Sequence, residues 1–149
     1  MKILIVGLGI QGKKRIKYLK KKEYFASYDI FNKKADYSLL SSVPLNKFDS
    51  VFLCVPDNQK YDLVKFFLIN KKNVFVEKPL FFDLKSINYL YRISFKNKCI
   101  LYSAYNHRFE PNIIKLKKDL NLHKSKIYNI RLFYGNGTAK NVKKSNWRD

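Results

Sequence analysis

Short apolar runs alternate with amphipathic segments along most of the chain. Runs rich in β-branched and aromatic residues predict strands that are buried on both faces. The predicted strands lie at residues 2–6, 25–30, 50–55, 73–77 and 98–105. Between them, apolar residues that can share one face predict helices. These helices lie at residues 11–22, 61–69 and 83–96, and a further helix begins near Pro111.

The order of these elements indicates the fold class. Strands that alternate with helices form a parallel sheet with helices on both faces, so we predict an α/β fold with a doubly wound sheet. Residues 31–48 are mostly polar, show no clear period, and are expected to be irregular. The segment at 126–135 alternates polar and apolar positions, which predicts a strand with one wet face.

Composition favours a folded protein without a membrane segment. The 149 residues are 46% hydrophobic and 16% aromatic, which is enough to fill a core. No apolar run approaches the roughly 20 residues that a membrane helix needs, and the N-terminus lacks the pattern of a signal peptide. A cytoplasmic location is therefore expected. Cys54 and Cys99 lie in apolar runs and are expected to be buried thiols, with no disulfide and no metal site.

A net charge of +20 raises the alternative of a nucleic-acid partner. Only five of the 31 basic residues are arginines, although arginine is the side chain that favours base reading and phosphate forks. The lysines near the first helix surround it and form no single stripe. We expect a solvated lysine surface and no nucleic-acid partner.

The motif GLGIQG at 7–12 carries the strongest chemical signal. Gly7, Gly9 and Gly12, with Ile10 and Gln11 between the last two, follow a buried strand and open a helix. This context fits the dinucleotide fingerprint, in which the glycines permit a tight turn, close approach of the pyrophosphate, and close packing of helix on strand. The helix N-terminus then presents unpaired N–H groups to the phosphates. A glycine turn without a ligand is the alternative.

The fingerprint also requires an acid near the end of the next strand, and Asp29 lies there. Its carboxylate could accept hydrogen bonds from both hydroxyls of the adenosine ribose. That favours NAD, because a 2′-phosphate would meet a like charge. Lys33 and Lys34 follow closely and could weaken the discrimination, so NADP is not excluded. A solvated Asp29 without a ligand stays open as the alternative.

Two later segments place polar side chains at the ends of predicted strands. VFVEKPL (74–80) supplies Glu77 and Lys78, and YNHRFEP (105–111) supplies Asn106 and Arg108. Ligands of open α/β sheets bind beyond the carboxyl ends of the strands, so these residues would face the same crevice as the glycine loop. A lysine there can donate to a substrate oxygen or relay a proton. A surface Glu–Lys pair in a turn is the alternative.

GLGIQG, VFLCVP, VFVEKPL and AYNHRFEP together resemble the glucose–fructose oxidoreductase / inositol dehydrogenase family, also called Gfo/Idh/MocA. The resemblance implies a Rossmann domain that binds NAD(P), here over residues 1–121, and a second α/β domain. Residues 122–149 resemble the start of that second domain, truncated after its first strand. The implied activity is hydride transfer at a hydroxyl carbon of a sugar, cyclitol or related compound.

The resemblance also assigns roles to residues. Lys78 matches the catalytic lysine that contacts the reacting hydroxyl and the nicotinamide region. The neighbouring residues of the cofactor and substrate pocket would be Val55, Pro56, Glu77, Pro79, Asn106 and Arg108. Homo-oligomers of the family are expected mainly through the second domain.

Two departures change what we expect. Many members carry a histidine four residues after the proline that ends the third strand, and here that position is Lys60. Members also supply an aspartate and a histidine beyond a WR-type segment, whereas this sequence ends at Asp149, and His123 does not match that histidine. We therefore expect an N-terminal fragment that binds nucleotide with little or no turnover. A non-catalytic nucleotide-binding module is the alternative.

Overall fold

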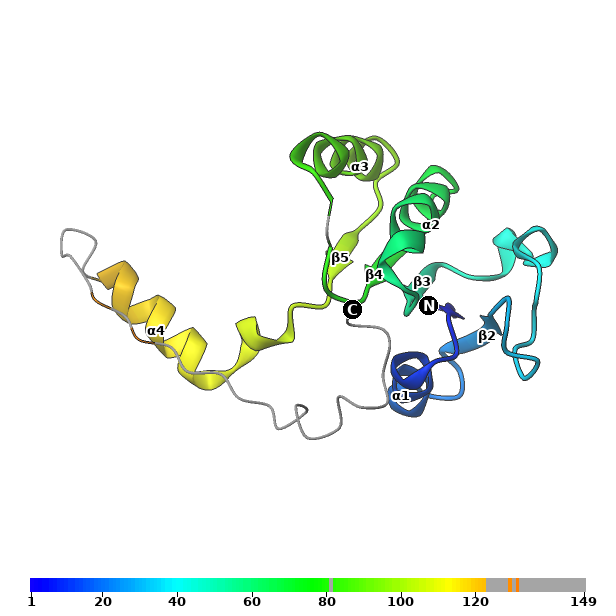
Figure 1. The fold of residues 1–149 in the computed structure, drawn as a ribbon, viewed down its shortest axis with the longest axis horizontal. Helices are drawn as coiled ribbons and strands as arrows, with labels where there is room; N and C mark the ends of the chain where they lie inside the picture. Colours follow the sequence, from blue (N-terminus) through cyan, green and yellow to red (C-terminus); the bar gives the residue numbers. More distant parts are fainter. Residues whose placement is uncertain (81, 123–128, 130, 132–149) are drawn as a thin grey trace. The chain divides into compact units, whose positions relative to one another are not determined.

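Residues 1–80, 82–122, 129 and 131 are described by the structure, which is a computed structural model (Figure 1). The chain separates into two units, Met1–Arg108 and Phe109–Asp149. The domain boundary expected after residue 121 stays a prediction. The strand expected at 126–135 falls outside the described residues, except for positions 129 and 131.

Five parallel strands form the sheet of the first unit, which confirms the predicted α/β class. They are β1 (Ile3–Val6), β2 (Tyr24–Tyr28), β3 (Ser50–Leu53), β4 (Asn73–Val76) and β5 (Leu101–Ser103). Their order across the sheet is β2-β1-β3-β4-β5, and each neighbouring pair is parallel. The chain therefore proceeds outward in one direction from β1 to β2 and in the other from β3 to β5. This reversal makes a switch point between β1 and β3, where open α/β sheets bind ligands.

Helices cover both faces of this sheet (Figure 1). α1 (Ile10–Tyr18) packs against β1 and β3 on one face. α2 (Asp57–Ile69) packs against β3 and β4 on the other face, beside α3 (Leu84–Lys96). In the second unit, α4 (Pro111–Leu122) begins at the proline that the sequence marked as a helix start.

The alternation of side chains along β1 explains why two layers of core form. Leu4 and Val6 belong to the larger core with α2 and α3, in which Phe67 is completely buried. Ile3 and Ile5 point to the opposite face and pack with residues around α1. Because successive strand residues face opposite sides, one apolar tetrapeptide serves both layers.

The bounds of the helices differ from the sequence pattern at two places. α1 ends at Tyr18 and not at residue 22, because the backbone turns beyond Leu19 and the N–H of Lys20 donates to the Glu23 carboxylate at 2.9 Å. α2 begins at Asp57 and not at residue 61, directly after Pro56 as its N-cap. A hydrogen bond marks the first of these ends and a proline the second, and apolar periodicity reports neither.

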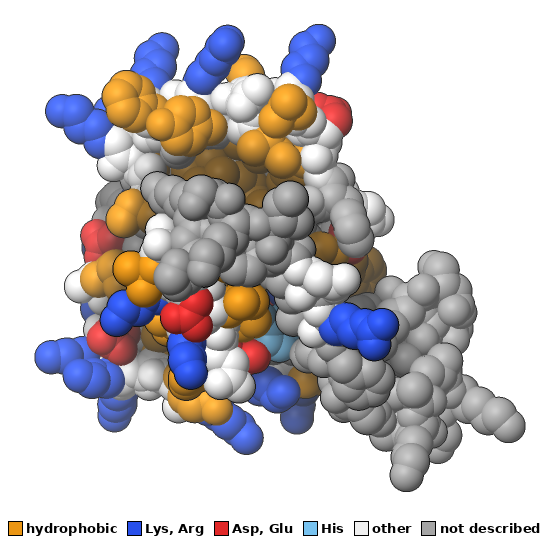
Figure 2. Space-filling view, turned by 90° about the vertical axis from the view of Figure 1, so that its left-hand side faces the viewer, with side chains coloured by type: hydrophobic (Ala, Val, Ile, Leu, Met, Phe, Trp, Pro, Cys, Tyr) orange, Lys and Arg blue, Asp and Glu red, His pale blue; other side chains and the backbone are white. Residues whose placement is uncertain are grey.

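Basic side chains lie at several separate places on the face shown in Figure 2 and do not gather into one patch there. Apolar side chains occur between them on the same face. Within the described part of the chain, no helix is long and apolar enough to cross a membrane. The expected cytoplasmic location and oligomeric state stay predictions.

Replacing Phe67 by alanine should strongly destabilise the first unit. The side chain is 0% exposed and lies in the core between the sheet and α2, so its removal leaves a cavity. We expect the free energy of unfolding to fall by about 3–5 kcal/mol in urea titrations. Phe31→Ala is the matched control, because Phe31 is 84% exposed and its loss should change the value by less than about 0.5 kcal/mol. Equal effects of the two substitutions would contradict this core.

Candidate functional site

The carboxyl ends of all five strands carry the residues that the sequence analysis singled out. Because the strands are parallel, these ends lie at one edge of the sheet. The segments that leave this edge, in chain order, are the glycine loop at 7–12, Asp29, Val55–Pro56, the turn at 77–80 and η3 (Asn106–Phe109). The topology therefore brings the predicted site residues to the same rim.

Gly7 and Gly12 make the close packing at the start of α1 possible. Gly7 has a φ of +89°, and a Cβ there would lie 2.5 Å from the carbonyl oxygen of Cys54. A Cβ on Gly12 would lie 1.9 Å from the carbonyl oxygen of Gly7. Both obstacles are backbone atoms, so a side chain could be accommodated only by moving the loop or the helix. These two glycines are needed by the fold itself.

Gly9 differs from the other two glycines. A Cβ built on it would meet nothing within 4 Å, so no packing contact of the chain requires a glycine here. Gly9 is also the N-cap of α1, it makes no side-chain capping bond, and the first turn of the helix contains no acid. Ile10, which is 76% exposed, and Gln11 follow at the same open helix start. This opening fits a diphosphate, which would accept hydrogen bonds from the helix N–H groups and interact favourably with the helix dipole.

Asp29 is tied to backbone on both of its oxygens. Its Oδ2 accepts from the N–H of Leu8 at 2.7 Å, and its Oδ1 accepts from Phe31 and Asn32 at 2.9 and 3.0 Å. Partial burial acts to raise the pKa of this carboxyl, but the three backbone hydrogen bonds outweigh it and hold the pKa below its ordinary value. A carboxylate has about four acceptor positions, so about one is left for a ligand. Accepting both ribose hydroxyls with full hydrogen bonds would therefore require one of these contacts to open.

Glu77 is held by a residue that sequence reasoning missed. Arg15 of α1 donates from Nε to Glu77 Oε1 at 2.8 Å, and its Nη2 contacts the same oxygen. The guanidinium also lies 4.7 Å from the centre of the Phe75 ring, an arrangement that favours a cation–π contact. Glu77 is 7% exposed, so this ion pair is largely shielded from water. The sequence did contain one sign that Arg15 has a special role, because it is the single arginine among the lysines of residues 13–22.

Lys60 occupies the position at which the resemblance expects a histidine, and it is 2% exposed. Its ammonium donates to Asp57 Oδ1 at 2.6 Å and to the carbonyl oxygen of Pro79 at 2.8 Å. The lysine therefore connects the first turns of α2 to the turn that follows β4. Sequence analysis marked the departure from histidine without finding this contact.

Lys78 lies between the two anchored residues of that turn. Its side chain is exposed and forms no hydrogen bond or ion pair with any described residue. With Ala104, Tyr105, Asn106 and His107 it lines a small pocket of about 100 Å³. The end of β4 and the end of β5 thus meet at a hollow that has a primary amine at its mouth.

The remaining predicted residues lie around the same rim without a direct contact that reveals their role. Arg108 has its guanidinium 6.0 Å from the centre of the Tyr102 ring. Val55 lies beside the glycine loop, because a Cβ on Gly7 would approach its Cγ1 to 3.1 Å. Pro56 is exposed and caps α2. Their binding roles stay predictions.

The thiol of Cys54, at the end of β3, does not act as a nucleophile here. Burial raises its pKa to about 12, and the nearby Glu77 carboxylate adds to this, while Arg15 and Lys60 act in the opposite direction. A thiol with this pKa is neutral at physiological pH, and the thiolate is the reactive form. The described residues contain no group of three or more His, Cys, Asp and Glu side chains that could hold a metal ion.

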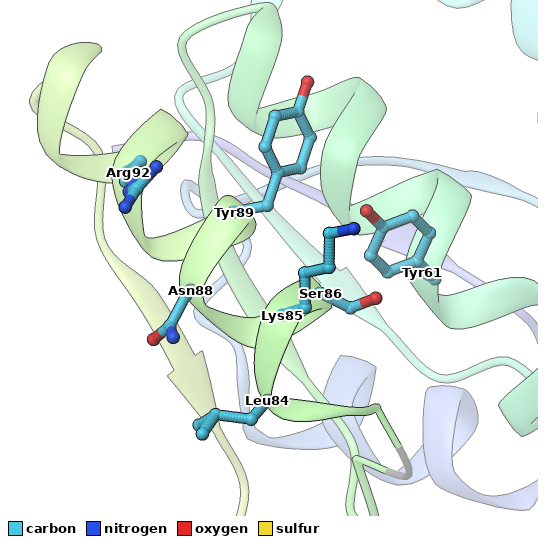
Figure 3. Close-up of a pocket in the computed structure, with 7 residues that line it drawn as sticks. All are labelled: Tyr61, Leu84, Lys85, Ser86, Asn88, Tyr89 and Arg92. Carbon is cyan, nitrogen blue, oxygen red and sulfur yellow. The ribbon is translucent and has the colours of Figure 1, made fainter.

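A larger hollow of about 660 Å³ lies on α2 and α3, away from the glycine loop. Figure 3 shows that its side chains leave α3 in different directions: Leu84 and Asn88 lie on one side of the helix, and Lys85 and Tyr89 on another. Lys85 and Ser86 point toward Tyr61 of α2, but Leu84, Asn88 and Arg92 lie on the other side of α3, so the lining as a whole does not converge on one point. We therefore place the functional site at the carboxyl edge of the sheet and not in this hollow.

Comparison with known proteins shows which family the chain belongs to. Residues 1–105 match the family model GFO_IDH_MocA, described as an oxidoreductase family with an NAD-binding Rossmann fold. The chain belongs to the Gfo/Idh/MocA family. The match includes the glycine loop and the 77–80 turn, and it ends at Tyr105, just before η3.

Individual relatives of this Gfo/Idh/MocA chain are longer than the chain. Over 70 residues it is 36% identical to myo-inositol 2-dehydrogenase of Thermotoga maritima, covering 47% of this chain and 21% of that protein. Over a stretch of the same length it is 29% identical to inositol 2-dehydrogenase of Rhizobium meliloti, with the same coverage. A solved structure of a probable dehydrogenase from Thermotoga maritima superposes with a TM-score of 0.64 at 25% identity, covering 83% of this chain and 42% of that one. The chain thus spans less than half the length of these relatives.

Gly12→Ala should destabilise the chain far more than Gly9→Ala. The new methyl group at Gly12 would collide with the carbonyl of Gly7, whereas the one at Gly9 would enter open space. We expect Gly12→Ala to lower the free energy of unfolding by about 2 kcal/mol or more and Gly9→Ala to change it by less than about 0.5 kcal/mol. Urea unfolding of both variants measures this. A similar loss from both would show that Gly9 also has a packing role.

The contribution of Asp29 to stability should depend on pH. Its pKa is lower in the folded chain than its ordinary value of 3.8, so the charged carboxylate stabilises the fold. That contribution is fully present above pH 3.8 and is lost as the pH falls through the folded pKa. We therefore expect wild type to exceed Asp29→Asn in free energy of unfolding at neutral pH, with the difference shrinking in acid. Asp62→Asn, on the exposed side of α2, is the control, and a pH-independent difference for Asp29→Asn would refute the argument.

Proposed function

We propose that this chain carries the nucleotide half of an NAD(P)-dependent oxidoreductase site. The complete site would transfer hydride at a hydroxyl carbon of a sugar, cyclitol or related compound. Membership of an NAD-binding oxidoreductase family supports the cofactor class. The names of the two curated relatives, both inositol dehydrogenases, support the substrate class.

The observation that carries the proposal is the opening at Gly9. The two other glycines of the motif are explained by backbone atoms that a Cβ would strike, but Gly9 faces empty space at an uncapped helix start. A ligand that approaches the backbone closely accounts for a glycine at such a position. A diphosphate is the group that the helix N-terminus suits.

The residues of the rim then take distinct roles. A bound nicotinamide supplies the hydride acceptor or donor of the reaction. The N–H groups at 10–12 hold the diphosphate, and Asp29 accepts from the adenosine ribose with its remaining acceptor position. Lys78, from the mouth of the small pocket, donates to the reacting hydroxyl oxygen and helps to move its proton.

Asp29 favours NAD over NADP in this proposal. A 2′-phosphate placed beside the carboxylate would be repelled by a like charge. The backbone hydrogen bonds that lower the pKa of Asp29 keep it ionised at physiological pH, so the repulsion persists there. Lys33 and Lys34 follow Asp29 closely in the sequence, and their positive charges reduce the difference in affinity between NAD and NADP. We therefore expect NAD to bind more tightly, with NADP still able to bind.

A nucleotide-binding module without catalysis is the second candidate, and one observation favours it. Lys78 has no hydrogen-bond or ion-pair partner among the described residues. A lysine that relays a proton is held in position by hydrogen bonds to neighbouring groups. Binding without turnover is therefore the outcome that distinguishes this candidate from the first.

Fluorescence titration of NADH tests the proposal directly. We expect saturable binding to the wild-type chain and a dissociation constant about tenfold higher or more for Gly9→Ala, which corresponds to about 1.4 kcal/mol. The reason is that the added methyl group occupies the space next to the diphosphate while the fold stays intact. Lys96→Met, at the far end of α3, is the control and should bind NADH as wild type does.

Two results would count against nucleotide binding. The first is an absence of saturable NADH binding by the wild-type chain. The second is DNA binding with a steep salt dependence and no response to NADH, which would favour the nucleic-acid alternative. Binding of NADH by Gly9→Ala with wild-type affinity would instead show that the diphosphate lies elsewhere.

A further inference from the structure

The turn at 77–80 is anchored at three points, and Lys78 lies between them. The Glu77 carboxylate is bound by Arg15, and the Pro79 carbonyl oxygen is bound by Lys60. The N–H of Leu80 donates to the hydroxyl of Tyr105 at 3.3 Å. Each neighbour of Lys78 is therefore fixed, while its own side chain stays exposed at the rim.

The two cations reach this turn from opposite faces of the sheet. Arg15 belongs to α1, and its guanidinium lies over Phe75 on that face. Lys60 belongs to α2, which covers the other face (Figure 1). A turn held on one side can still pivot, but contacts from both sides oppose displacement in either direction. The position of the Lys78 backbone is thus determined by both helices.

The burial of Lys60 indicates that its contact is specific. Removing an ammonium group from water costs several kcal/mol unless its donors are satisfied. Here one donor meets the Asp57 carboxylate, and a second meets a main-chain carbonyl on another element. An apolar side chain would fill the same space at less cost, so the bond to Pro79 gives the lysine a purpose that packing alone does not.

We propose that Arg15 and Lys60 are positioning residues, which hold the 77–80 turn from the two faces of the sheet and so place the Lys78 ammonium at the crevice. This inference rests on the proposed function, because it concerns the geometry of the lysine assigned to the reacting hydroxyl. Neither residue touches the reacting atoms in this scheme. Arg15 acts through the side chain of Glu77 and Lys60 through the carbonyl of Pro79, the two residues on either side of Lys78.

Amide hydrogen exchange at Leu80 tests the anchoring without any ligand. We expect exchange at Leu80 to be about tenfold faster in Lys60→Met and in Arg15→Met, because the turn opens more often when one anchor is lost. Lys96→Met is the matched control, since Lys96 is exposed on α3 and should leave the rate unchanged. Exchange at Leu80 that is no faster in the two variants than in the control would overturn the proposal.

A second readout separates positioning from general stability. In the proposed site, ADP-ribose would contact only the glycine loop and Asp29, whereas the nicotinamide half of NADH would also reach the region of Lys78. We therefore expect Lys60→Met to leave ADP-ribose affinity within about twofold of wild type while weakening NADH about fivefold or more. Equal weakening of both nucleotides would overturn the proposal, because it would indicate a general loss of structure.

Two further outcomes have a defined meaning, namely variants that do not fold and a wild-type chain that binds no nucleotide. If Lys60→Met does not fold, Lys60→Gln is used, because glutamine keeps one donor at this position. Failure of both variants to fold would assign Lys60 to the stability of the fold and overturn its positioning role. A wild-type chain that binds neither nucleotide would contradict the proposed function alone, and the exchange rates at Leu80 would still decide whether the two cations anchor the turn.

Discussion

Close packing of the α1 N-terminus against the ends of β1 and β3 is the constraint on which the arrangement of this edge of the sheet depends. Gly7 passes the Cys54 carbonyl at a distance that excludes a Cβ, and Gly12 passes Gly7 in the same way. The N–H of Gly7 also donates to the Tyr28 carbonyl at 2.8 Å, so the loop is fixed to β2 as well. The short loop at 7–12 therefore contacts the ends of three strands, β1, β2 and β3, and leads directly into α1. The open helix start at Gly9 lies between these two closely packed glycines, although no packing contact requires Gly9 itself.

The charged side chains at this edge of the sheet connect separate segments of the chain to one another, independently of any ligand. The Asp29 carboxylate joins the glycine loop to the turn after β2 through three backbone donors. Glu77 is paired with Arg15, and Lys60 is bound to Asp57 and to Pro79. Lys78 is the exception, since none of these contacts involves its side chain. The charged groups on either side of Lys78 are thus paired among themselves, while its own ammonium stays exposed.

The sequence predicted those parts of the structure that follow from local pattern. The parallel strands and the helices between them were readable from spacing and residue type. The roles of Arg15 and Lys60 were not, because nothing in a spacing shows which distant side chains meet across a sheet. The helix ends at Tyr18 and Asp57 were also missed, since hydrogen bonds and a proline decide them.

The two halves of the crevice differ in how their chemistry is encoded, and this explains why one is easier to identify. The half that we propose for the phosphates would consist of backbone N–H groups and glycines, so a short contiguous motif would specify it almost completely. The hydroxyl half is made of side chains from the ends of β4 and β5, whose placement depends on contacts from α1 and α2. The family match, which ends at residue 105, includes all of the first half and the Lys78 turn of the second. In the proposed site the glycine motif would recognise a part of the cofactor that does not react, so substrate selectivity would depend more on the surroundings of Lys78.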